Sequence, residues 1–150
     1  MSDFFQFEAD FVDSLRCIPM QVRLKLDTCG VKLKLPDWHH LQAEERQSLV
    51  ELPCTTLTEI NAYRQYLKQI VLARSGAEPK DLPIEENPSW MNEDMVPESV
   101  IAKAQESNLE VTVEKWRNLL PVERFALIKL SRSSHENRNF LPAAKEFHLL

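Results

Sequence analysis

The chain has 150 residues, of which 43% are hydrophobic and 27% charged, and this composition is typical of a soluble globular domain. Its formal net charge of -5 disfavours a general nucleic-acid binder, because such proteins gain most of their affinity by neutralising phosphates. The sequence holds two glycines, Gly30 and Gly76, too few for a Walker loop or a dinucleotide-binding fingerprint. Most nucleotide-dependent enzyme classes are therefore excluded.

The N-terminus and the cysteines favour a cytoplasmic protein. Met1–Phe5 has no basic leader, and no apolar run in the chain approaches the length of a membrane span. Cys17, Cys29 and Cys54 make an odd number at wide spacings, which fits reduced thiols better than a disulfide framework. We expect one cytoplasmic domain over residues 1–150.

Two helices are predicted at the start of the chain. The first ends before Pro19 and carries apolar residues at helical spacing, namely Phe7, Phe11, Leu15 and Ile18. The second opens at Pro19, places Val22, Leu26 and Cys29 on one face, and ends at Gly30 as a left-handed cap.

Residues 31–35 alternate strictly between apolar and polar side chains, as a half-buried strand does, and residues 109–113 do the same. The lysines of the first segment oppose Glu110 of the second by charge. If these segments meet, they form a short two-stranded ribbon.

An internal repeat organises the rest of the chain. Residues 38–52 and 116–130 both follow the pattern W-x2-L-x3-E-R-x2-L-x2-L at an offset of 78 residues, which predicts two repeats over about 19–53 and 97–131, joined by a connector over 77–98. The repeated positions are Trp38, Leu41, Glu45, Arg46, Leu49, Leu52, Trp116, Leu119, Glu123, Arg124, Leu127 and Leu130. We interpret them as scaffold and not as a site.

Each repeat contains one core helix, with its start at Gln42 or Leu120. Glu45 and Glu123 then occupy the third helical position, where a carboxylate accepts from free N–H groups. Pro121 falls at the first helical position. The leucines of each motif share one buried face, on which the preceding tryptophan packs, and the arginines are expected to stack on a tryptophan or to pair across the repeats.

The two core helices differ in polarity. The first carries Gln47, Ser48 and Glu51, whereas residues 125–128 of the second are all apolar. The second repeat should therefore lie deeper, and Leu127→Ala should destabilise the protein more than Leu49→Ala.

The longest predicted helix follows the first repeat. Thr56 and Glu59 form a capping box at its start, and Ser75-Gly76 ends it. Its apolar stripe consists of Leu57, Ile60, Tyr63, Leu67, Ile70 and Val71.

The connector over 77–98 is rich in proline and acidic residues, yet it is too apolar for a free linker. Its apolar residues are Leu82, Ile84, Trp90, Met91, Met95 and Val96. We expect it to lie as a strap across the core, with a partner-docking site as the alternative. After the second repeat, residues 131–139 form a polar loop, and a terminal amphipathic turn or two follows.

No constellation predicts catalysis, a cofactor or a metal. Cys29, Cys54 and the pair His39-His40 match no zinc spacing, and we interpret the cysteines as small buried hydrophobes. Residues 133–136 contain the residue types of a hydrolytic triad, but four consecutive residues cannot meet in that geometry. An anion site built from Arg132, His135 and Arg138 is the weaker alternative to a solvated polar surface there.

Residues 7–20 and 22–33 are similar to the nitrate-reductase-associated protein family of cyanobacteria, and the likeness continues through both E-R helices to the C-terminus. The resemblance implies a small cytoplasmic protein linked to assimilatory nitrate reductase and to molybdenum-cofactor genes, and needed for active reductase. It transfers no catalytic residue.

Three functions follow from these observations. The first is a non-catalytic accessory protein that binds nitrate reductase or assists its maturation or cofactor insertion. The alternative is a carrier or enzyme acting on the molybdenum cofactor or an iron-sulfur cluster, for which the cysteines and the run 132–138 are the material. A DNA-binding regulator is disfavoured by the acidic charge.

Two surfaces are candidates for partner binding. One is the exposed side of the first repeat, with Gln47 and Glu51 beside the histidine pair, because a duplicated protein that needed only stability had no reason to keep these polar residues. The other is the strap with Trp90, Met91 and Met95, because aromatic and methionine side chains often anchor partners. The sequence predicts an all-α domain with one of these two surfaces facing the partner.

Overall fold

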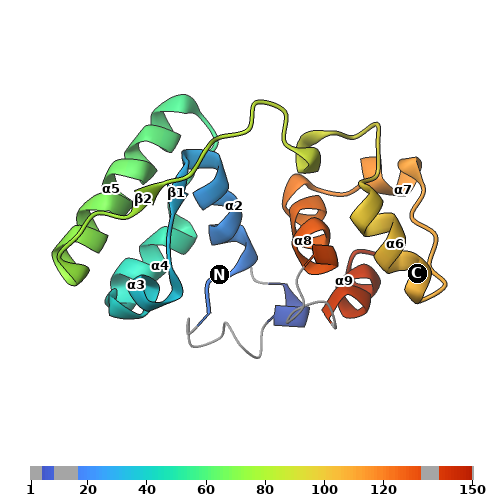
Figure 1. Cartoon of the computed structure of the whole chain (residues 1–150), viewed down its shortest axis with the longest axis horizontal. Helices are drawn as coiled ribbons and strands as arrows, with labels where there is room; N and C mark the ends of the chain where they lie inside the picture. The colour runs from blue at the N-terminus through green and yellow to red at the C-terminus, as the bar shows by residue number, and fades with distance from the viewer. Residues whose placement is uncertain (1–4, 9–16, 133–138, 150) are drawn as a thin grey trace. The chain divides into compact units, whose positions relative to one another are not determined.

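The computed structural model describes residues 5–8, 17–132 and 139–149. In this part of the chain the protein is mostly helical, with eight α-helices and one two-stranded antiparallel sheet (Figure 1). It divides into two compact units, which hold residues 8 and 17–84 and residues 5–7, 85–132 and 139–149. The helical class is confirmed, and the single domain stays a prediction. None of the described helices is long and apolar enough to cross a membrane.

The first unit contains four helices and the small sheet. Its elements are, in order, α2 (Met20–Cys29), β1 (Val31–Lys32), α3 (Leu35–His40), α4 (Ala43–Glu51), α5 (Leu57–Ser75) and β2 (Lys80–Asp81). Figure 1 shows β2 returning along β1 after the long α5.

Gly30 ends α2 as the sequence predicts. Its φ of 75° is left-handed, and its N–H donates to the carbonyl of Leu26. A Cβ at this position would lie 2.7 Å from Cγ1 of Ile84. Glycine is therefore required both for the backbone turn and for the close passage of the chain after β2.

The predicted partner of the first alternating segment is wrong. β1 pairs with β2, with Val31 opposite Asp81 and Lys32 opposite Lys80, and residues 109–113 form no strand. Leu82 extends the pairing, since its N–H donates to the carbonyl of Gly30 at 2.8 Å.

Ion pairs link β2 to α5. Oδ1 of Asp81 lies 2.6 Å from Nη2 of Arg64 and 2.9 Å from Nζ of Lys68. Arg64 also donates to the carbonyls of Cys29 and Gly30. Arg64 thus links α5 to the end of α2 and to β2. Alternation of apolar and polar residues does not predict this pairing, because the contact depends on a side chain of α5.

The capping box of α5 is confirmed. The N–H of Glu59 donates to the hydroxyl of Thr56, and the Glu59 carboxylate accepts from the N–H of Thr56. Gly76 ends the helix with a φ of 83°. Leu57, however, is exposed, because at about 100° per residue it lies about 20° from Lys68 and about 120° from the buried Tyr63.

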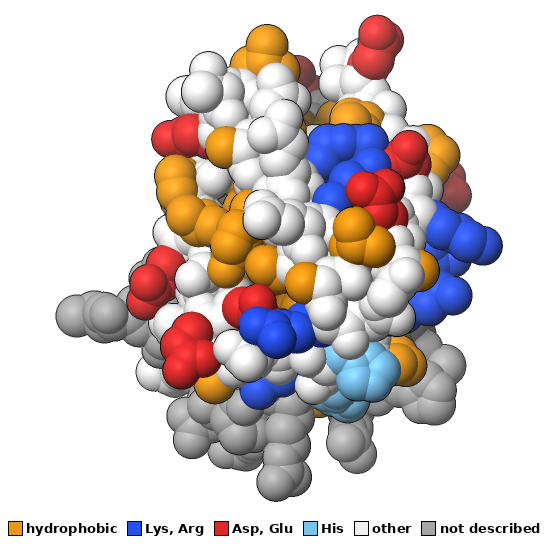
Figure 2. Space-filling model, turned by 90° about the vertical axis from the view of Figure 1, so that its left-hand side faces the viewer, with side chains coloured by type: hydrophobic (Ala, Val, Ile, Leu, Met, Phe, Trp, Pro, Cys, Tyr) orange, Lys and Arg blue, Asp and Glu red, His pale blue; other side chains and the backbone are white. Residues whose placement is uncertain are grey.

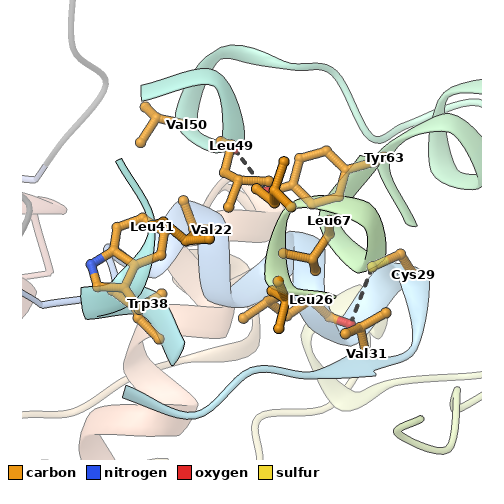
Figure 3. Close-up of a cluster of buried hydrophobic side chains, with 13 residues drawn as sticks. Val22, Leu26, Cys29, Val31, Trp38, Leu41, Leu49, Val50, Tyr63 and Leu67 are labelled. Carbon is orange, nitrogen blue, oxygen red and sulfur yellow. Dashed lines mark hydrogen bonds between the residues drawn. The ribbon is translucent and has the colours of Figure 1, made fainter. Parts of the chain in front are cut away.

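The core of the first unit collects apolar side chains from every one of its helices (Figure 3). Trp38, Leu49 and Leu67 are fully buried in it. The hydroxyl of Tyr63 donates to the carbonyl of Leu49 at 2.7 Å, which satisfies the polar end of a buried ring. Trp38 and Leu49 belong to the same buried cluster, which agrees with the prediction that the tryptophan packs on the apolar face of the core helix.

The second unit is built from four helices and a short 3-10 turn. Its elements are η2 (Ser89–Met91), α6 (Glu98–Glu106), α7 (Val113–Arg117), α8 (Pro121–Arg132) and α9 (Phe140–Glu146). The 3-10 turn η1 (Gln6–Glu8) adds Phe5 and Phe7, whose rings contact Phe147 at centroid distances of 4.9 and 6.1 Å. The predicted terminal helical segment is confirmed as α9. Most of the predicted lead-in helix, over 9–16, and residues 133–138 of the polar run lie outside the described residues.

The two core helices differ in how much they bury, as predicted. Six residues of α8 are buried, against two of α4. Leu49 and Leu127 are nevertheless both fully buried. Their burial therefore gives no reason to expect that Leu127→Ala lowers stability more than Leu49→Ala.

Leu52 corrects the expectation that both final leucines of the motif are buried. It is 36% exposed, whereas Leu130 is fully buried. Pro53 disfavours the helical conformation at the residue before it, and Leu52 has an extended backbone with ψ of 136°. α4 therefore ends at Glu51, while α8 continues past Leu130.

Candidate functional site

Both motifs begin their core helix with the same carboxylate contact. The N–H of Gln42 donates to Oε1 of Glu45, and the N–H of Leu120 donates to Oε1 of Glu123, each at 2.8 Å. Burial raises the pKa of Glu45, but the hydrogen bonds from Arg74 and Gln42 outweigh it, and its pKa lies below the usual value. The predicted third-position role of both glutamates is confirmed.

The motif arginines bind backbone carbonyls, not tryptophan rings or the other repeat. Nη1 of Arg46 donates to the carbonyls of Trp38 at 3.3 Å and Leu41 at 2.8 Å. These carbonyls lie at the end of α3, where the N–H of Leu41 also donates to the carbonyl of Trp38 at 3.2 Å. The contacts that the structure shows differ from the expected stacking or cross-repeat pairing for a physical reason: a guanidinium supplies several donors to the carbonyls at a helix end.

Arg124 makes the same contacts in the second unit. Its Nη1 donates to the carbonyls of Trp116 at 3.4 Å and Leu119 at 2.6 Å. Its Nε also donates to the carbonyl of Trp90 at 2.7 Å. The corresponding Nε of Arg46 is buried and has no partner within the described residues.

Residues 88–95, which we call the strap, are therefore held by the second motif. Besides the Arg124 contact, the indole N–H of Trp116 donates to the carbonyl of Asn92 at 2.8 Å. The Trp90 ring meets Phe125 edge to face, with centroids 6.0 Å apart. The second motif thus holds the strap, a link that apolar periodicity cannot show because it depends on backbone carbonyls.

The strap exposes two methionines. Met91 is 54% exposed and Met95 64%, and both follow the backbone carbonyl that Arg124 fixes. A hollow of about 470 Å³ lies beside Met91, lined by Glu86, Asn87, Pro88, Met91 and Asn92. Trp90 is half-buried, so its main contact is with Phe125. Met91 and Met95 are therefore the exposed side chains of the strap, whereas Trp90 is half-buried.

The other candidate surface lies on α4 in the first unit. Nε2 of Gln47 donates to Oε1 of Glu51 at 2.8 Å, one helical turn on. His39 and His40 are exposed, and Figure 2 shows histidine side chains at the surface of this end of the molecule. The structure thus assigns Gln47 and Glu51 to one unit and Trp90, Met91 and Met95 to the other.

Cys29 and Cys54 lie in an environment that keeps them protonated. Burial, with a smaller contribution from Cys54, raises the pKa of Cys29 to about 12, and burial raises that of Cys54 to about 11. Their thiols lie 3.7 and 3.8 Å from the carbonyls of Leu26 and Lys25. Thiolates are the metal-binding and nucleophilic form, so this environment works against both roles. In the described ranges no three His, Cys, Asp or Glu residues form a potential metal site.

The polar run near the C-terminus is only partly described. Arg132 is exposed at the end of α8, and His135 and Arg138 lie outside the described residues. The anion site proposed for these three residues stays a prediction.

A model of a protein family described as conserved nitrate reductase-associated protein matches residues 4–147. The chain belongs to this family. The resemblance inferred from residues 7–33 is therefore confirmed, and the match covers both motifs and the strap of this nitrate reductase-associated family member. No curated protein and no solved structure matches the chain.

Proposed function

We propose that this chain is a non-catalytic accessory protein of assimilatory nitrate reductase, which binds the reductase or assists its maturation or cofactor insertion. Family membership supports the choice of partner. The observation that carries the mode of action is the strap, whose backbone is fixed at Trp90 and Asn92 while Met91 and Met95 point to solvent.

The strap suits protein binding for two physical reasons. Methionine is flexible and polarisable, so it fits an irregular partner surface and gains contact area there. The backbone is already ordered by Arg124 and Trp116, so binding loses less conformational entropy than it would with a free loop. The Arg117–Asp94 ion pair at 3.2 Å adds little, because both side chains are exposed.

We further propose that the two units are related repeats. Three pairs of helices begin 78 residues apart, namely α2 and α6, α3 and α7, and α4 and α8. Arg46 and Arg124 bind equivalent carbonyls, and Trp38 and Trp116 are both fully buried. On this proposal the second repeat binds the strap through Nε of Arg124, and the duplication provided the helices that hold it.

The carrier alternative has no contact in its favour. It needs thiolates at neutral pH, and burial keeps the pKa of Cys29 and Cys54 well above that range.

The double substitution Met91→Gln/Met95→Gln tests the proposal. We expect it to lower the nitrate reductase activity restored to a strain lacking this protein by about tenfold or more, because each truncated anchor typically weakens binding by about 1–2 kcal/mol. The melting temperature should stay within about 3 °C, since both side chains are more than half exposed.

The matched control is Leu57→Gln/Leu72→Gln, which removes two exposed apolar side chains from α5 in the first unit. It should restore full activity. Glu51→Lys in the same assay tests the α4 surface. A methionine variant that keeps its fold and restores full activity, while Glu51→Lys does not, would move the partner surface to α4.

A further inference from the structure

The second unit has an open hollow beside the segment that joins α6 to α7. Its volume is about 610 Å³, and it is lined by Ile101, Gln105, Asn108, Leu109, Glu110 and Val111. Leu109 and Val111 are buried, while Asn108 and Glu110 are exposed. The segment thus alternates as a half-buried strand does, but it has no strand partner within the described residues.

The first unit has a segment of the same local geometry at Gly30–Lys32. Gly30 and Asn108 each follow a helix closely and both have left-handed backbones, with φ of 75° and 55°. They stand 78 residues apart, the offset that separates the starts of α2 and α6. Val31 and Leu109, the next residues, are both buried.

In the first unit this segment is paired. β2 lies antiparallel to β1, and the N–H of Leu82 donates to the carbonyl of Gly30 at 2.8 Å. The chain then passes over Gly30 with Ile84. Its own connector therefore completes the strand edge of the first unit (Figure 1).

In the second unit the corresponding edge carries a side-chain contact in place of a paired strand: Nζ of Lys115 donates to the carbonyl of Glu110 at 3.4 Å. Within the described ranges, the carbonyl of Asn108 receives no hydrogen bond, and no segment pairs with residues 108–110. An unpaired strand edge is a ready template for a further strand, and proteins normally cover or block it. Here the edge borders a hollow whose lining is part apolar and part polar.

We propose that this hollow binds an extended segment of a partner protein, which adds to residues 108–110 as an antiparallel strand in the place that β2 takes in the first unit. Main-chain hydrogen bonds give such binding its affinity, and the adjoining hollow selects the side chains. The site is separate from the strap, and the inference does not rest on the function proposed above.

Two differences between the units define the partner sequence. Glu110 stands where the first unit has Lys32, and it is the charged residue that lines the hollow, so the bound segment carries a lysine or arginine beside it. Asn108 adds a side chain where Gly30 has none, so the residue in the place of Ile84 must be small.

A peptide designed on this basis provides the probe: residues 79–85 of this chain with Ile84→Ala, blocked at both ends, in which Lys80 takes the place opposite Glu110 that it takes opposite Lys32 in the first unit. Titrated into the ¹⁵N-labelled full chain at millimolar concentration, it should shift the amide signals of residues 101–111 in a saturable way. The signals of β1 and of the strap should stay unchanged.

Methylation of single peptide nitrogens separates strand addition from general adhesion. N-methylation at position 82 removes the N–H that would donate to the carbonyl of Asn108, and it should weaken binding about tenfold. N-methylation at position 81 is the control, because N–H groups of alternate residues in an antiparallel strand point away from the partner. It should change the dissociation constant less than about twofold.

A protein variant tests the charge preference. Glu110→Lys should weaken the peptide about threefold or more, whereas Lys32→Glu, on the edge that β2 already covers, should not. The proposal is overturned by an absence of shifts at residues 101–111, by equal affinity of the two methylated peptides, or by shifts confined to β1 or the strap. Because the reductase takes no part, failure here leaves the methionine experiment unaffected.

Discussion

Arg124→Ala should lower the free energy of unfolding by more than about 3 kcal/mol. The side chain is 2% exposed and donates to the carbonyls of Leu119 at 2.6 Å and Trp90 at 2.7 Å. Each buried acceptor left without a donor costs about 1–3 kcal/mol, and the lost side chain also leaves a cavity. Denaturant titration measures the effect as a lower midpoint at unchanged slope.

Arg46→Ala is the matched control, because Arg46 binds the equivalent carbonyls but is only half-buried and holds no residue of the strap within the described part of the chain. It should be less destabilising. In native-state hydrogen exchange, Arg124→Ala alone should also release the strap amides. Equal losses in the two variants, or a strap that stays protected without Arg124, would contradict the role assigned to this residue.

Leu130→Ala should destabilise the protein by about 2–5 kcal/mol, and Leu52→Ala by less than about 1 kcal/mol. The two leucines occupy the same position of the repeated pattern, yet Leu130 is fully buried in α8 and Leu52 is 36% exposed beyond the end of α4. Thermal and denaturant unfolding of both variants measure the difference.

Leu49→Ala and Leu127→Ala serve as the internal reference, since both leucines are fully buried and both variants should fall in the higher range. Equal losses of stability in Leu52→Ala and Leu130→Ala would contradict the claim that Leu130 contributes more because α8 continues past it while α4 ends before Leu52.

Sequence reasoning located the ends of α2 and α5 because these depend on local chemistry, whereas it predicted neither α3 nor α7. Gly30 and Gly76 stop their helices with left-handed backbones, and Thr56 with Glu59 starts α5, as each residue type predicts. The exposure of Leu52 was also within reach, because Pro53 follows it directly.

Contacts distant in sequence were beyond that reasoning. β1 pairs with β2, whose Asp81 forms ion pairs with α5, and not with the alternating residues 109–113. For the candidate site, composition predicted a strap with methionines. It could not predict that Trp116 and Arg124 would hold it, because their acceptors are backbone carbonyls that every residue possesses.

The central claim, that the strap binds nitrate reductase or its maturation machinery, is tested most directly by affinity capture. The full chain, the Met91→Gln/Met95→Gln variant and the Leu57→Gln/Leu72→Gln control are immobilised and exposed to extracts of nitrate-grown cells, and the bound proteins are identified by mass spectrometry. The account predicts that the unaltered chain and the control recover the reductase or its cofactor-insertion proteins, and that the methionine variant loses them. Equal recovery by all three proteins, or recovery by none, would contradict it.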